Sequence, residues 1–233
     1  MSMTVTNVDT GSVKLWQGEF RDETFVAASA KTYLEGTLLA RKAVADAIVA
    51  DGTGNTGDGT CTATTVVAGS TVPLVGAYNL ECITATTNGG TFKLEDPNGS
   101  LISNNLVMTA GAGASTVFEI AGMTFTLTDG ATDFIVGDAF SLTVAADGKI
   151  YPYATDGAGG VQIPTAVLTE DKVATGAGNI PIRAMISGQL IAERLVIDAD
   201  GDASNITAAI LDQLRDFTLV ALSVPDISEL DNQ

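Results

Sequence analysis

The run from Asn179 to Ile197 restricts the possible folds most, because its apolar residues fall on alternate positions. The even-numbered residues from Ile180 to Ile186 are all apolar, while Arg183 and Ser187 occupy odd-numbered positions. A period of two places the two sets on opposite faces of a β-strand. Gly188 then interrupts the pattern, which predicts a bulge, a tight bend or a close backbone approach before a second strand. We therefore expect a β domain built around this pair of strands.

The composition also favours β structure with many turns. Apolar residues make up 45% of the 233 residues, charged residues make up 17%, and 25 residues are glycine. Segments rich in Thr and Val between glycine-containing turns are typical of short strands. A chain of this length buries a substantial core without disulfides, either as one large domain or as two small ones.

The charge and the missing histidine exclude several classes of function. The formal net charge is −17, from 28 acidic and 11 basic residues. Nucleic acids and anionic membrane surfaces would be repelled, so we expect neither as a partner. The chain has no histidine, which excludes Ser-His-Asp and Cys-His nucleophiles and most zinc sites. We expect no catalytic residue, no metal ligand and no cofactor.

The first residues and the hydropathy of the chain bear on where it is made. The segment MSMTVTNVDT has neither a basic start nor an apolar centre, so it does not resemble a signal peptide. No apolar run reaches the length of about 18 residues that a membrane helix needs. We expect synthesis in a cytoplasm, where Cys61 and Cys82 would be two buried thiols, although a late disulfide between them is left open.

Residues 1–34 are polar with scattered aromatic residues and no sustained period. Two interpretations remain open. In the first, Trp16, Phe20, Phe25 and Tyr33 pack on their own domain. In the second, the segment is an extended arm that docks on a neighbouring subunit or partner by adding a strand.

The composition changes at Asp51 and changes back at Lys149. Between them, short strand candidates alternate with turn signals such as Asn88-Gly89-Gly90, which predicts a small β-sandwich inserted into a host domain. Insertion requires that the two ends of the insert lie close together. The expected core of the insert consists of its aromatic residues Phe92, Phe118, Phe125, Phe134 and Phe140.

The rest of the host domain contains one predicted helix. An apolar stripe with helical spacing runs from Ser204 to Phe217, with Ser204 or Asp202 as its cap. Pro164 interrupts a predicted strand over residues 161–168 and predicts an edge or a bulge. Asp198, Asp200 and Asp202 alternate as in a calcium loop, but the glycine and the glutamate that such a loop requires are absent, so we interpret them as an acidic turn.

Several segments of the host domain resemble the head decoration (capsid-stabilising) proteins of tailed phages, of the lambda D type. They are GTLLAR (36–41), GKIYPYATDGAGG (148–160), PTAVLTEDKVA (164–174), IRAMISGQLIAERLVI (182–197) and the final strand TLVALSV. The insert separately resembles a module found in phage structural proteins, through GNTGDGT (54–60), NGGTFKLEDPNG (88–99) and DGATDFIVGDAFSLTV (129–144).

The resemblance implies a mainly β fold in three parts. Residues 1–34 would be an N-terminal capsid-binding arm, with Trp16, Phe20 and Phe25 as hypothetical capsid contacts. Residues 35–50 and 149–233 would form a lambda-D-like β domain of the β-tulip type with one short helix. Residues 51–148 would form an inserted immunoglobulin-like (Ig-like) β-sandwich.

The implied function is that of a structural cement protein and not of an enzyme. It would bind the outer surface of the expanded phage head as homotrimers and stabilise the lattice of the major capsid protein. The implied partners are the major capsid protein and other copies of the chain, with contact to host surfaces or glycans through the insert left open. Two alternatives remain: another phage structural protein, such as a tail tube or minor capsid subunit, and a carbohydrate-binding adhesion module.

Overall fold

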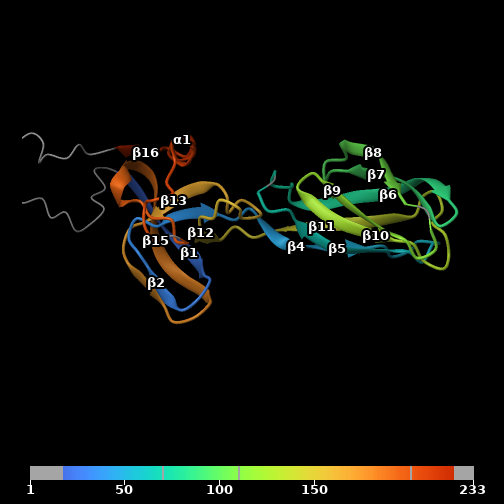
Figure 1. The fold of residues 1–233 in the computed structure, drawn as a ribbon, viewed down its shortest axis with the longest axis horizontal. Coiled ribbons are helices and arrows are strands. Elements are labelled where there is room, and N and C mark those ends of the chain that lie inside the picture. The colour runs from blue at the N-terminus through green and yellow to red at the C-terminus, as the bar shows by residue number, and fades with distance from the viewer. Residues whose placement is uncertain (1–17, 70, 110, 200, 223–233) are drawn as a thin grey trace, which may run out of the picture. The chain divides into compact units, whose positions relative to one another are not determined.

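The computed structural model describes residues 18–222 apart from 70, 110 and 200, and this part of the chain is mainly β with one α-helix (Figure 1). The chain divides into two compact units. One comprises Met1–Arg41, Lys149–Thr155 and Val161–Gln233, and the other comprises Lys42–Gly148 and Asp156–Gly160. We call their described parts the barrel unit and the inserted unit.

The barrel unit contains eight strands, one 3-10 turn and the helix. Its elements are β1 (Gly18–Ala27), β2 (Lys31–Tyr33), β3 (Leu38–Arg41), β12 (Ile150–Pro152), β13 (Pro164–Leu168), β14 (Lys172–Ala174), β15 (Gly178–Ile191), η1 (Ala192–Arg194), α1 (Ala208–Asp216) and β16 (Leu219–Leu222).

Five of these strands close into a small barrel. Their order is β1, β12, β3, β13 and β15, and β15 pairs back onto β1 in antiparallel fashion from Gly178 to Gly188. Strand β15 continues through Gly188, where the parallel strand β16 becomes its partner. The bulge predicted at Gly188 has a counterpart close by, since the register of β15 against β1 shifts between Ser187 and Met185. The expected second strand is wrong, because β15 continues past Gly188 with β16 as its new partner. The bulge predicted at Pro164 is present in the pairing of β13 with β3.

The barrel unit has two apolar cores, one inside the barrel and one outside it. The inner core draws residues from all five closing strands, among them Phe25, Leu39 and Ile182. The outer core contains Leu38 and Met185 and is covered by the helix and β16. Leu38 and Leu39 belong to different cores because successive side chains of a strand point to opposite faces.

The helix is shorter than the sequence predicts. It begins at Ala208, and the Thr207 side chain caps it by accepting a hydrogen bond from the backbone N–H of Ile210. Ile210 and Leu214 are its buried residues, whereas Phe217 remains 40% exposed. Asp202 instead accepts a hydrogen bond from the backbone N–H of Ser204, within the turn that precedes the helix.

Part of the expected arm belongs to the barrel itself. Residues 1–17, including Trp16, lie outside the described residues, but Gly18–Ala27 forms β1 and Lys31–Tyr33 forms β2. Strand β1 pairs with β15 over ten residues and completes the barrel wall. An arm that extends to residue 34 is therefore incorrect, because apolar residues in this stretch are needed in the unit's own core.

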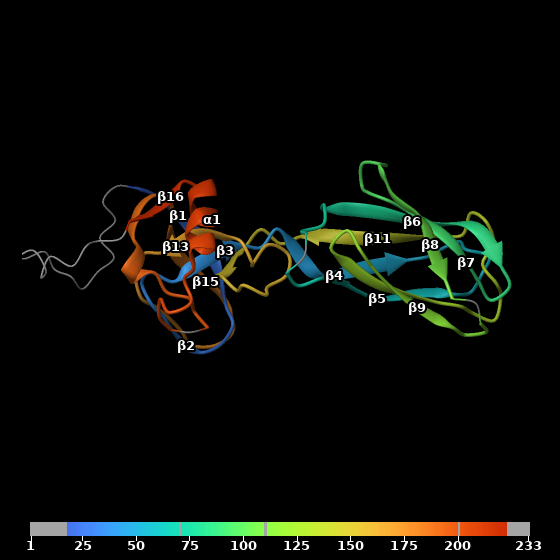
Figure 2. The same cartoon turned by 45° about the horizontal axis from the view of Figure 1, so that its top comes forward.

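The inserted unit is an eight-stranded curled sheet. Its strands are β4 (Val44–Asp51), β5 (Thr60–Val66), β6 (Gly76–Thr86), β7 (Gly89–Glu95), β8 (Leu101–Met108), β9 (Ser115–Ile120), β10 (Met123–Thr128) and β11 (Ala139–Ala146). Their order is β8, β7, β6, β11, β4, β5, β10 and β9, and the β4–β5 link consists of the pair Ala47 and Thr65 (Figure 2).

One core fills the space that this sheet encloses. Strand β10 illustrates the pattern, since Met123, Phe125 and Leu127 are buried while the threonines between them are half-buried. Of the aromatic residues expected in this core, Phe92, Phe125, Phe134 and Phe140 are buried, and Phe118 is partly buried against them. This prediction is confirmed.

The boundary between the two units differs from the expected one. The sequence placed residues 35–50 in the host domain, but β4 lies in the sheet of the inserted unit, where it pairs with β11. Val44 and Ile48 of β4 are buried in that unit's core. The loop Asp156–Gly160 also belongs to this unit, and the Gly159 carbonyl accepts a hydrogen bond from the Ala43 N–H at 2.7 Å.

Candidate functional site

The three aromatic residues expected to contact a capsid have different environments. Phe25 is fully buried in the inner core, with its ring in edge contact with Tyr33 at 4.7 Å between centroids. Phe20 is 40% exposed. Trp16 lies outside the described residues. Phe25 is therefore a structural residue of the barrel, which corrects its assignment as a contact, while Phe20 stays a candidate.

The surface around Phe20 combines an aromatic ring with charged groups. The Arg183 guanidinium lies over the Phe20 ring at 5.2 Å, from the neighbouring strand β15. On the other face of β1, Glu23 contacts Arg41 at 2.5 Å and Arg21 at 3.9 Å. The outer face of β1 and β15 thus presents an exposed ring held by a cation–π contact, a combination found at protein interfaces.

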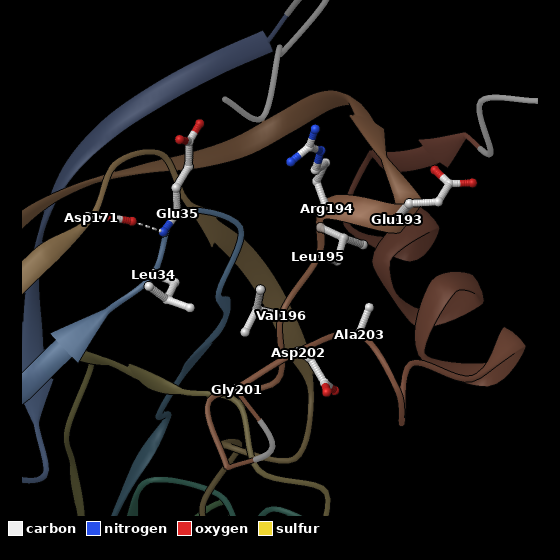
Figure 3. Close-up of a pocket in the computed structure, with 10 residues that line it drawn as sticks. All are labelled: Leu34, Glu35, Asp171, Glu193, Arg194, Leu195, Val196, Gly201, Asp202 and Ala203. Carbon is white, nitrogen blue, oxygen red and sulfur yellow. Dashed lines mark hydrogen bonds between the residues drawn. The ribbon is translucent and has the colours of Figure 1, made fainter. Parts of the chain in front are cut away.

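A recess of about 360 Å³ lies on the barrel unit between loops that are distant in sequence (Figure 3). Its lining comes from the end of β2, the loop before β14, η1 and the turn before the helix. The lining residues are Leu34, Glu35, Asp171, Glu193, Arg194, Leu195, Val196, Gly201, Asp202 and Ala203. Nothing in the sequence predicts this grouping, because no local pattern connects residues on four loops.

Two carboxylates of the recess accept hydrogen bonds from the backbone of the loops that line it. Asp171 accepts a hydrogen bond from the backbone N–H of Glu35 at 2.7 Å. Hydrogen bonds from the side chain and backbone of Ser204 hold the pKa of Asp202 below its ordinary value. In Figure 3, Glu35 and Arg194 point the same way, whereas Asp202 points away from them. The recess therefore has polar groups on its rim, and the carboxylates of Asp171 and Asp202 stabilise the loops that form it.

The alternating aspartates of the preceding turn also have structural partners. Asp198 accepts a charged hydrogen bond from the Lys31 Nζ at 2.6 Å, which links the turn to β2. Asp202 caps its own turn, as described above, and Asp200 lies outside the described residues. These contacts agree with the interpretation of an acidic turn.

The two cysteines are buried free thiols of the inserted unit. Burial raises the pKa of Cys61 to about 12. Burial also raises the pKa of Cys82, although a hydrogen bond with the Thr84 carbonyl acts in the opposite direction. Both thiols therefore stay protonated near neutral pH, which makes them poor nucleophiles.

Two further properties concern the part of the chain that the structure describes. No helix there is long and apolar enough to cross a membrane. No group of three or more His, Cys, Asp or Glu side chains there is arranged to hold a metal ion.

Comparisons with known proteins give no family assignment. No family model matches the chain, and no curated protein matches it. Among solved structures, the crystal structure of Xanthomonas campestris FlgL aligns with a TM-score of 0.30 and 19% sequence identity, over 49% of this chain and 34% of that one. The chain thus spans about a third of the length of FlgL, and a likeness this low carries no argument about fold or function.

Proposed function

We propose that the chain is a structural decoration protein of a phage head. In this proposal it binds the outer surface of the expanded shell as trimers and stabilises the lattice of the major capsid protein. The observation that carries the proposal is the placement of the segments that resemble lambda-D-type proteins. The first of them, GTLLAR, is separated from the next by about one hundred residues, yet together they supply β3, β12, β13, β14, β15 and β16 of the barrel unit. Of the segment 148–160, Gly148 and Asp156–Gly160 belong to the inserted unit.

The buried residues of these segments give the resemblance a physical basis. In GTLLAR, Leu38, Leu39 and Ala40 are fully buried, and in PTAVLTEDKVA, Val167 and Leu168 are buried. The shared pattern therefore coincides with the positions that build the barrel's two cores. A fold by itself does not determine function, so the proposal rests on the resemblance of these segments and on their burial in the barrel's cores.

A cement protein acts by buried contact repeated over many copies. Burying an aromatic side chain such as Phe20 or Trp16 removes about 150–250 Å² from water. At about 25 cal/mol per Å² this contributes roughly 4–6 kcal/mol before the cost of ordering the segment. A single such contact binds weakly, but three linked copies bind through avidity. The proposed capsid-binding segment is residues 1–17 together with the exposed face of β1 around Phe20.

Charge favours the barrel unit as the part that makes contacts between copies. The inserted unit contains twelve acidic residues and two lysines, Lys42 and Lys93. Two such surfaces repel each other when they approach within about 8–10 Å at physiological salt. We therefore place the trimer and lattice contacts on the barrel unit.

The test is co-sedimentation of the chain with expanded heads that lack their decoration protein. The full chain should bind and raise the temperature at which the heads lose their DNA. A variant without residues 1–17 should keep its folded barrel and lose most of its binding, while Phe20→Ala should weaken binding less. A chain that leaves heads unbound, or that is found on tails and not on heads, contradicts the proposal.

A further inference from the structure

Strand β15 gains a second partner at Gly188, and this residue shows which edge of the strand continues beyond its described neighbour. Gly188 pairs with Gly18 of β1 in antiparallel fashion and with Leu219 of β16 in parallel fashion. A residue has one neighbour on each edge of its strand, so β1 and β16 flank β15 on opposite edges. Strand β16 follows its edge as far as Ile191, whereas the described part of β1 begins at Gly18. The edge that β1 occupies therefore continues past the start of that strand.

The backbone groups on this continuing edge belong to Gln189 and Ile191. The N–H of Gly188 donates to the Thr218 carbonyl at 2.9 Å, on the β16 side. Because the backbone groups of successive residues alternate between the two edges of a strand, those of Gln189 and Ile191 face the β1 side. No described strand pairs with them there. An open row of donors and acceptors of this kind is a template for an added strand.

The surface beside this edge is grooved and apolar. A groove of about 440 Å³ is lined by Gly18, Glu19, Ser187, Gly188 and Gln189. Leu190 and Met185 are buried in the outer core. Met185 reaches across Gly18, where an added Cβ would lie 2.3 Å from the methionine Cε. A large apolar side chain placed opposite Leu190 would therefore extend the outer core along the edge.

We propose that Leu15–Gln17 bind along this edge as a continuation of β1. The register that pairs Gly18 with Gly188 places Gln17 opposite Gln189, Trp16 opposite Leu190 and Leu15 opposite Ile191. The occupant is the chain's own segment, because Gln17 is joined covalently to Gly18 at the point where the edge begins. A strand from another molecule would first have to displace it and would lose more entropy on binding.

The added strand fixes two aromatic side chains on one surface. Side chains alternate between the faces of a strand, so Trp16 takes the same face of β1 as Gly18 and Phe20. Phe20 lies opposite Met185 and is 40% exposed. The capsid-binding function proposed above, on which this step rests, then uses two rings that are held in place before binding. Such preorganisation lowers the entropic cost of association.

The test uses the fluorescence of Trp16, which is the only tryptophan of the chain. In the full chain without phage heads, its emission should lie at shorter wavelength, and be quenched less by acrylamide, than in the urea-unfolded chain. The double variant Leu15→Pro, Gln17→Pro removes two N–H groups that the pairing uses and should lose both differences. The matched control Thr10→Pro, Ser12→Pro has the same spacing outside the pairing and should keep them.

Hydrogen exchange provides a second measurement on the described edge. The amides of Gln189 and Ile191 should be protected in the wild type and in the control, and should exchange faster in the Leu15→Pro, Gln17→Pro variant. The amide of Gly188, which bonds to Thr218, should stay protected in all three proteins. Equal exchange of Gln189 and Ile191 in all three proteins contradicts the added strand.

The remaining outcomes also overturn the proposal. If Trp16 of the folded wild type emits and is quenched as in the unfolded chain, the segment does not bind the edge. If the short-wavelength emission survives the Leu15→Pro, Gln17→Pro substitutions, the indole is buried elsewhere. If it is lost on dilution, a second copy supplies the strand. Because these measurements contain no heads, their failure leaves the cement function standing. A variant that frees Trp16 and still binds heads like the wild type supports the added strand and contradicts the part of Trp16 in head binding.

Discussion

The barrel unit and the inserted unit have similar numbers of acidic residues and differ fourfold in basic ones. The described residues of the barrel unit include eleven Asp or Glu and eight Lys or Arg, whereas the inserted unit has twelve and two. The basic residues of the barrel unit form pairs such as Arg41 with Glu23 and Lys31 with Asp198. Two mainly β units therefore differ in net charge, and the inserted unit, with ten more acidic than basic residues, repels its own copies more strongly.

The two units also enclose their cores differently. The barrel closes through β1 and β15 and buries apolar residues on both faces of its wall, inside the barrel and beneath the helix. The inserted unit curls one long sheet around a single core. The barrel consequently depends on one strand from the N-terminal end of the chain, while the inserted unit depends on how well its aromatic side chains pack. The following predictions test this contrast.

Removal of residues 1–27 has the largest expected effect. It deletes β1, opens the barrel and exposes the inner core, so the whole stability of the barrel unit, roughly 5–15 kcal/mol for a domain, should be lost. Calorimetry should then retain only the unfolding transition of the inserted unit. Removal of residues 1–17 is the control and should retain both transitions. A barrel transition that survives the longer deletion would show that β1 is dispensable.

Truncating one core phenylalanine in each unit should separate their stabilities. Phe25 is in edge contact with Tyr33, and Phe134 is in edge contact with Phe92 and Phe140. Phe25→Ala should destabilise the barrel unit, and Phe134→Ala the inserted unit, by about 3–5 kcal/mol each. Hydrogen exchange resolved by residue measures both. A loss of protection in both units from either substitution would mean that they unfold as one.

The glycine directly before β5 should show how tightly the inserted unit is packed. A Cβ added at Gly59 would lie 2.1 Å from the Phe134 ring, whereas one added at Gly176 in the barrel unit would meet open space. Gly59→Ala should cost about 1–3 kcal/mol in chemical denaturation. Gly176→Ala should be neutral or stabilising by up to about 1 kcal/mol. Equal effects of the two substitutions would contradict this difference in packing.

A dependence of stability on alkaline pH is expected that is confined to the inserted unit. Burial raises the folded-state pKa of Cys61 to about 12, so the unfolded chain loses this proton first as the pH rises. The protonated thiol contributes its full stabilisation below about pH 8.5, and this contribution is lost between pH 8.5 and pH 12. The loss amounts to at most about 2–3 kcal/mol by pH 10.5.

Chemical denaturation of wild type and Cys61→Ala at pH 8 and pH 10.5 measures this effect. The substitution should reduce the pH dependence of the inserted unit and leave that of the barrel unit unchanged. If the free energy of unfolding changed equally between pH 8 and pH 10.5 in both proteins, the pH dependence would come from groups other than Cys61.

The sequence predicts the parts of this fold that follow a local period. Alternation identified the strand that contains Ile182, and spaced phenylalanines between turns identified the core of the inserted unit. Local patterns do not predict which strands pair with each other when the two strands lie far apart in the sequence. Nothing near Phe25 indicates that β1 joins β15 some 155 residues later. Nothing near Val44 indicates that β4 pairs with β11 about one hundred residues later. The recess likewise depends on loops that meet only in the folded chain.

Electron cryomicroscopy of expanded heads mixed with the full chain tests the central claim most directly. The account predicts trimers on the outer surface of the shell, with the barrel unit against the capsid lattice and no contact between inserted units of neighbouring copies. Heads without bound chain, or chains attached through the inserted unit, would contradict it.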